Sequence, residues 1–216
     1  MPDKKLTTKI VKPIARLRRE PTQGRAQKTI ETIFEATAQI VEQDGVGALS
    51  TNRIAQKAGF SIGTLYQYFP TKEAIIHAMT DRARRSHMDR LHVLLSQAEQ
   101  EADVDHEGVL RQFIRMNLST FARGGRTWRS LVRFAWRYGD QDEITAAVRE
   151  TSERIAVTLS RKRKLGWRAP TPALMFVLTR SILGAIRSAA LEDSPLLDGE
   201  EFEDELVRLA LGLLQE

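Results

Sequence analysis

The sequence contains no cysteine, which excludes disulfide bonds, thiolate chemistry and zinc sites that use cysteine. It has no uninterrupted run of about 20 apolar residues, the length needed to span a bilayer. The longest apolar windows are broken by Thr or Arg, as in "ALMFVLTRSILGAI". The absence of cysteine fits a reducing compartment, so we expect a cytoplasmic protein with no membrane partner.

Alternating apolar and polar segments of strand length are also absent, as are internal repeats and low-complexity tracts. The four histidines follow no metal-ligand pattern; His87 and His92, for example, are five residues apart and do not share a helix face. We therefore expect neither a metal nor a cofactor.

Positive charge is concentrated at the N-terminus. Residues 1–28 hold nine Lys or Arg and two acidic residues, a net charge of +7, whereas residues 29–216 hold 24 basic and 26 acidic residues, a net of −2. We interpret residues 1–24 as a flexible basic arm that contacts DNA phosphates. Two alternatives stay open, a solvated tail without a partner and an organellar transit peptide, although prolines interrupt any helix in this segment. The arm lacks the apolar core of a secretory signal.

From Gln27 onward the apolar residues recur at helical spacing, and Gly and Pro separate the helical segments. The sequence predicts an all-α fold of eight or nine helices. They cover about 27–45, 51–58, 61–69, 71–100, 109–122, 127–138, 141–164, 171–192 and 199–215, with "EADVDHEG" as a break after the fourth.

The string "GFSIG", residues 59–63, has two incompatible interpretations. It fits G-x-S-x-G, the turn between a strand and a helix that exposes a nucleophilic serine in α/β-hydrolases. However, the preceding "TNRIAQKA" has helical spacing and a capping residue at its start, and there are no strands to position an acid and a histidine. The alternative is that Ser61 caps a helix.

A helix-turn-helix explains more of this segment. Two short helices that meet at a large angle need a small residue at their contact, a left-handed residue in the turn and an apolar residue that fixes the second helix. Ala55, Gly59 and Leu65 meet these needs. Gly63 then removes a side chain where the second helix would approach a phosphate, and the free amides at its N-terminus face anions.

The segments "TIETIFEATAQIVEQDG" and "LSTNRIAQKAGFSIGTLYQYFPTKEAI" resemble the DNA-binding domain of the tetracycline-repressor (TetR) family of bacterial transcription regulators. The resemblance covers about residues 25–76; the rest is similar only in helicity and length. It implies an N-terminal three-helix DNA-binding domain, residues 25–72, and a larger helical ligand-binding and dimerisation domain, residues 73–216. The DNA-binding residues that it implies are Arg25, Thr51, Arg53, Ser61, Gly63, Thr64, Tyr66, Gln67, Tyr68 and Lys72.

Within this set, Gln67 and Thr64 are the residues that we expect to read bases, since glutamine can pair with adenine through two hydrogen bonds. Phe60 departs from the family pattern, where a smaller aliphatic residue is commoner. The sequence leaves open whether Phe60 changes the packing of the turn or faces the DNA flank.

Two further sets of residues are expected in the C-terminal half. Apolar stripes with small residues predict a dimer interface at Leu174, Leu178, Ser181, Ile182, Ala185, Phe202, Leu206, Leu209 and Leu213. An aromatic-rich region with two arginines predicts a pocket for a hydrophobic or amphipathic ligand, with room for an acidic one, at Phe113, Met116, Asn117, Phe121, Trp128, Arg133, Phe134 and Arg137. For both sets the alternative is ordinary intrachain core.

The resemblance thus implies a ligand-responsive, homodimeric, sequence-specific DNA-binding regulator and not an enzyme. We expect a repressor that a small molecule releases from a palindromic operator, and that is nucleoid-associated when bound to DNA. Two alternatives remain: a DNA-associated helical protein without an effector, such as an architectural or recombination factor, and a serine hydrolase that uses Ser61.

Overall fold

The computed structural model describes residues 24–216 except 123–124, 139–140, 163 and 165, so the predicted arm, up to residue 23, lies outside the described residues. Two short 3-10 helices, η1 (Val46–Ala48) and η2 (Pro195–Asp198), accompany the α-helices. The α-helices are α1 (Gly24–Asp44), α2 (Thr51–Ala58), α3 (Ile62–Tyr68), α4 (Lys72–Gln100), α5 (His106–Ala122), α6 (Gly125–Tyr138), α7 (Gln141–Arg161), α8 (Pro172–Glu192) and α9 (Glu200–Leu214). Over the described residues there is no strand, only an isolated bridge between Trp167 and Gln215. The all-α prediction is confirmed.

Most helix starts follow from capping side chains that the sequence shows. The Ser50, Ser61 and Thr71 hydroxyls accept hydrogen bonds from the amides of Arg53, Thr64 and Ala74, at 3.2, 3.1 and 3.2 Å. One prediction was wrong in detail, because α5 begins at His106 and not near 109. The Asp105 carboxylate accepts a hydrogen bond from the Gly108 amide at 3.0 Å, so part of the predicted break forms the first turn of α5.

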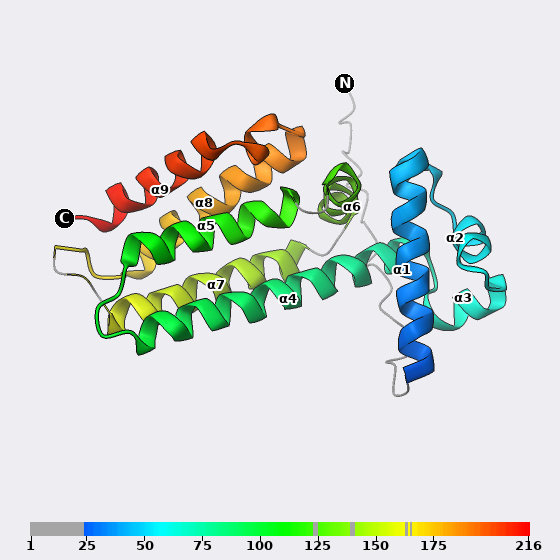
Figure 1. Cartoon of the computed structure of the whole chain (residues 1–216), viewed down its shortest axis with the longest axis horizontal. Coiled ribbons are helices and arrows are strands. Elements are labelled where there is room, and N and C mark those ends of the chain that lie inside the picture. The colour runs from blue at the N-terminus through cyan, green and yellow to red at the C-terminus, as the bar shows by residue number, and fades with distance from the viewer. Residues whose placement is uncertain (1–23, 123–124, 139–140, 163, 165) are drawn as a thin grey trace, which may run out of the picture.

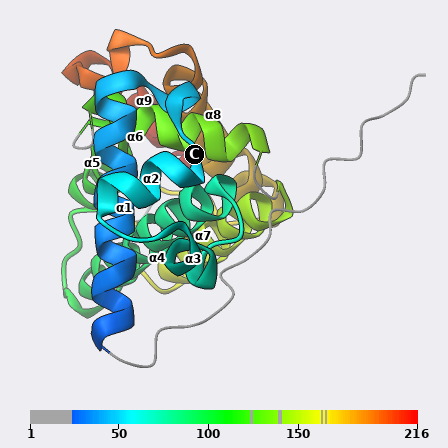
Figure 2. The same ribbon diagram turned by 90° about the vertical axis from the view of Figure 1, so that its right-hand side faces the viewer.

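The N-terminal domain consists of α1, α2, α3 and the start of α4, which meet around a core of their own. Ile33, Ile54, Leu65, Phe69 and Ile75 are fully buried there. Figure 2 looks onto α2 and α3 from outside, with α1 beside them. Burial of these apolar side chains fixes the angle between α2 and α3, so the exposed side of α3 has a defined orientation.

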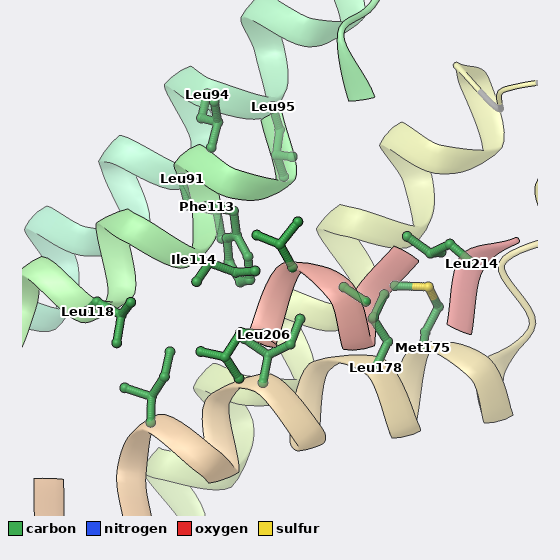
Figure 3. Packing of buried hydrophobic residues seen from close by; sticks show 14 of the residues in the cluster. Leu91, Leu94, Leu95, Phe113, Ile114, Leu118, Met175, Leu178, Leu206 and Leu214 are labelled. Atoms are coloured by element: carbon green, nitrogen blue, oxygen red, sulfur yellow. The ribbon is translucent and has the colours of Figure 1, made fainter. Parts of the chain in front are cut away.

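The C-terminal domain is a bundle of α5, α7, α8 and α9 with most of α4. Its core contains Leu91, Phe113, Ile114, Leu178 and Leu206, which come from four helices and pack together (Figure 3). Helix α4 runs from the N-terminal domain along this bundle (Figure 1), so it belongs to both domains.

Helix α6 lies between the two domains (Figure 1). Leu131 is buried in the N-terminal core, Val132 is buried in the C-terminal core, and Trp128 packs against both. An ion pair of 3.7 Å between Arg82 on α4 and Glu31 on α1 adds a second, solvent-exposed connection. Helices α4 and α6 therefore both contribute residues to the two cores.

Helix α8 is long and apolar enough to cross a membrane by length and composition, with a mean hydropathy of 1.5, and it alone is so among the described helices. It packs against α5, α7 and α9, and Leu178, Ile182 and Ile186 lie in the C-terminal core. These features are typical of the central helix of a helical domain.

Candidate DNA-binding surface and ligand cavity

The turn between α2 and α3 depends on Gly59, whose φ of 74° and ψ of 24° are left-handed. The Gly59 amide donates to the Gln56 carbonyl at 3.2 Å, and the Phe60 amide donates to the Ala55 carbonyl at 2.9 Å. This pair of bonds is a Schellman motif, in which the residue after the glycine often makes an apolar contact with the helix that it ends. Phe60 is half-buried against the N-terminal core, so it packs inward.

The start of α3 is open on its outer side. The Ser61 hydroxyl accepts a hydrogen bond from the amide of Thr64 and lies 2.9 Å from the Thr64 hydroxyl. A Cβ added at Gly63 would meet only the Ser61 hydroxyl, at 3.7 Å, which is ordinary van der Waals contact. Nothing inside the described chain therefore requires glycine at position 63.

The hydrolase interpretation of Ser61 needs a strand directly before the serine, and the structure has helix α2 there. The nucleophile elbow is thus not formed.

Several residues of the predicted DNA-binding set lie on the exposed side of α2 and α3. Gln67 is exposed and Tyr66 is 44% exposed, with its hydroxyl 3.2 Å from the Thr51 hydroxyl. Tyr68 is half-buried and packs against the N-terminal core. Tyr66 and Gln67 therefore face outward together, next to the start of α2.

The predicted DNA-binding set contains three cationic residues, of which two have partners within the chain and the third lies on α1. Residues 45–72 contain three basic and no acidic residues. Arg53 forms an ion pair with Asp44, the last residue of α1. The Lys72 ammonium donates to the Leu49 carbonyl at 2.9 Å and keeps two further donors. Arg25 is exposed in the first turn of α1.

A cavity of about 520 Å³ lies between α4, α5, α6, α7 and α8. Of the predicted ligand-binding residues, Asn117 and Trp128 line it, whereas Phe113 lines a separate, apolar cavity of about 70 Å³.

The other predicted ligand-binding residues lie elsewhere. Met116 packs against the C-terminal core and Phe134 against the N-terminal core. Arg133 is not among the residues that line the large cavity, and its guanidinium pairs with Asp193 at 2.9 Å. The side chains of Phe121 and Arg137 are outside the described residues.

Sequence reasoning found Asn117 but missed most of the other polar residues of this cavity. They include His77, Thr80, Asp81, Arg84 and His87 on α4, and Arg180 and Arg187 on α8. The α4 residues recur every three or four positions, so the signal was a polar stripe on one helix face. Only the fold reveals that this stripe lines a cavity.

Two ionisable groups of the cavity have shifted pKa values. Burial raises the pKa of Asp81, but hydrogen bonds from Arg84 and Arg85 outweigh this effect and hold the pKa below its ordinary value. Burial, with a smaller contribution from Arg90, lowers the pKa of His87 to about 4. The His87 imidazole is thus neutral at pH 7, and its Nδ1 atom is buried without a hydrogen-bond partner. The described residues include no group of three His, Asp or Glu that could hold a metal ion.

The predicted dimer residues separate into two groups. Leu174, Leu178, Ile182 and Leu206 are buried in the C-terminal core of the same chain, which corrects their assignment to a partner surface. Leu209 is exposed, and Ser181, Ala185, Phe202 and Leu213 are half-buried. On the outer face of α8, Phe176 and Val177 are exposed instead, at 56% and 47%.

Residues 33–79 match the profile of a family described as "Bacterial regulatory proteins, tetR family". The HTH-type transcriptional regulator EthR of Mycobacterium tuberculosis is 36% identical over 92 residues, which are 42% of this chain and 41% of EthR. The HTH-type transcriptional repressor DrrR1 of Streptomyces coeruleorubidus is 34% identical over 68 residues, 31% of this chain and 25% of DrrR1. The chain thus matches less than half the length of these relatives.

Among solved structures, SmeT in a complex with triclosan has a TM-score of 0.62 with 20% identity, and the match covers 88% of this chain and 93% of SmeT. SmeT is the repressor of the Stenotrophomonas maltophilia multidrug efflux pump SmeDEF. This similarity extends over both domains and shows that the fold is shared.

Proposed function

We propose that this chain, which belongs to the tetR family of bacterial regulatory proteins, acts in the cytoplasm as a homodimeric repressor that a small molecule releases from its operator. One observation carries the DNA-binding part of the proposal. Helix α3 has an open N-terminus with a glycine that the chain itself does not require, and exposed Tyr66 and Gln67 follow it.

In this proposal α3 lies in the major groove. Its N-terminal amides approach a phosphate at Gly63, because a side chain there would hold the backbone away. Gln67 then reads a base, with adenine as the expected partner. Tyr66 and Thr51, joined through their hydroxyls, contact the adjoining backbone as a unit. Arg53 and Lys72 add phosphate contacts, for which Arg53 exchanges Asp44 for the phosphate.

The dimer in this proposal uses the outer faces of α8 and α9. Phe176, Val177 and Leu209 are exposed apolar residues there. A twofold axis at this surface would place two copies of α3 about one DNA turn apart, so the operator is a palindrome.

Helix α6 provides a direct route from the cavity to the DNA-binding domain. Its Trp128, Val132 and Ala135 line the cavity, while Leu131 is buried in the N-terminal core against α1. A ligand that binds better to one position of α6 than to another therefore changes the position of the DNA-binding domain.

Selection of bound sequences from random DNA tests the function. We expect enrichment of a palindrome, and loss of one base preference in each half-site for Gln67→Ala. Uniform recovery of random sequences would refute specific DNA binding.

A further inference from the structure

The charges in the large cavity indicate the chemical class of its ligand. Three arginines and one aspartate line it, a net charge of +2 from these residues. Arg84 is engaged by an ion pair of 2.6 Å with Asp81, a carboxylate that it shares with Arg85. The cavity arginines without a carboxylate partner among the described residues are thus Arg180 and Arg187, both on α8.

Neither of these two arginines forms an ion pair with a described residue; each is held by an aromatic ring. The Arg180 guanidinium lies 3.9 Å from the centre of the Phe176 ring, and the Arg187 guanidinium lies 5.2 Å from the centre of the Trp136 ring. Stacking on an aromatic face leaves the in-plane N–H donors of a guanidinium available for hydrogen bonds. Both side chains are half-buried, so solvation of these donors is incomplete.

The rest of the wall is mostly apolar, with a few polar side chains such as Asn117 and Thr120. Its apolar part includes Trp128, Trp136, Val132, Leu183 and Ile186. A neutral apolar ligand would fill this space but would displace water from two cations without replacing its hydrogen bonds, which is costly. A ligand with an anionic group on an apolar body replaces those hydrogen bonds with charge-assisted ones.

We propose that the cavity selects hydrophobic anions, with an aromatic or aliphatic body against Trp128 and Trp136 and a carboxylate or sulfonate on Arg187 and Arg180. This inference rests on the proposed function in that it takes the cavity as the effector site.

Two fluorescent probes with the same apolar body test the proposal without DNA. 1-Anilinonaphthalene-8-sulfonate carries a sulfonate, and N-phenyl-1-naphthylamine lacks it. We expect the sulfonate to bind at least about tenfold more tightly, about 1.4 kcal/mol, with one molecule per chain, and its affinity alone to fall as salt rises. Equal affinities for the two probes would overturn the proposal.

Substitutions of Arg187 test whether this residue is responsible for the preference for the sulfonate. Arg187→Gln should weaken sulfonate binding about tenfold and leave the neutral probe unchanged, whereas Arg187→Lys should retain part of the preference. Arg208→Gln is the matched control, since Arg208 is exposed on α9 and pairs with Glu205. Equal weakening of both probes by Arg187→Gln would mean a structural role and would refute the proposal.

The proposal would also be refuted if these arginines pair with acidic residues of a partner subunit. In that case Arg187→Gln would shift the protein from dimer to monomer in sedimentation and would leave probe binding unchanged. Failure of this proposal would not refute the proposed function. If the cavity shows no preference for anions, operator binding and its release by neutral compounds can still be measured.

Discussion

Replacement of Gly63 by alanine should change fold stability and DNA affinity in opposite directions. The added Cβ meets only the Ser61 hydroxyl, at 3.7 Å, so the folded chain accepts it without movement. Alanine is favoured over glycine in a helix by about 0.5–1 kcal/mol. For a protein of this size that gain corresponds to a melting temperature about 1–4 °C higher.

The same methyl group should weaken DNA binding. If the backbone of α3 touches a phosphate at Gly63, the extra carbon separates them by more than an amide–phosphate hydrogen bond tolerates. Loss of one charge-assisted hydrogen bond costs about 1.5–3 kcal/mol, or roughly a tenfold to hundredfold rise in Kd. Fluorescence anisotropy with the selected duplex measures this Kd, and thermal unfolding monitored by circular dichroism measures stability.

Gly59→Ala is the matched control, four residues earlier in the turn. At Gly59 a Cβ meets nothing within 4 Å, but φ is 74°, and a left-handed alanine costs about 1–2 kcal/mol. Gly59→Ala should therefore lower the melting temperature. A Gly63→Ala protein that binds the duplex as tightly as the wild type, or that is less stable, would refute the reasoning about Gly63.

Three other predictions follow from individual contacts and charges. Tyr66→Phe removes the exposed hydroxyl contact with Thr51, so the free energy of unfolding should change by less than about 0.5 kcal/mol while the Kd for the duplex rises. An unchanged Kd would exclude a role of this hydroxyl in DNA binding. Because the pKa of His87 is lowered from 6.5 to about 4, the folded state loses stability as pH falls from about 6.5 to 4, by at most about 3 kcal/mol, and urea titrations of His87→Gln should show a smaller loss. Deletion of residues 2–20, which hold seven basic residues, should reduce the dependence of log Kd on log salt; an equal slope would show that the arm makes no phosphate contact.

Local features of the fold could be predicted because their causes are local. Ser50, Ser61 and Thr71 cap helices through bonds to residues three positions ahead, and Gly59 ends α2 through its own conformation. The direction of Phe60 was undecided, since it depends on what the rest of the N-terminal core leaves open.

Features formed between distant segments could not be predicted in this way. The apolar stripe of Leu174, Leu178 and Ile182 identifies a buried face of α8, but the same stripe would fit burial by another subunit. The cavity required the positions of five helices, so the polar stripe on α4 and the arginines of α8 had no visible connection in the sequence.

The spacing of the two half-sites tests the central claim most directly. The measurement compares the Kd of the protein for the selected palindrome with its Kd for the same duplex after insertion of about five base pairs, half a DNA turn, at the centre. If two copies of α3 bind as a fixed pair, the insertion turns one half-site to the opposite side of the duplex, and affinity should fall about a hundredfold or more. An unchanged Kd would contradict the account, because it would mean that the two half-sites are not read together by one dimer.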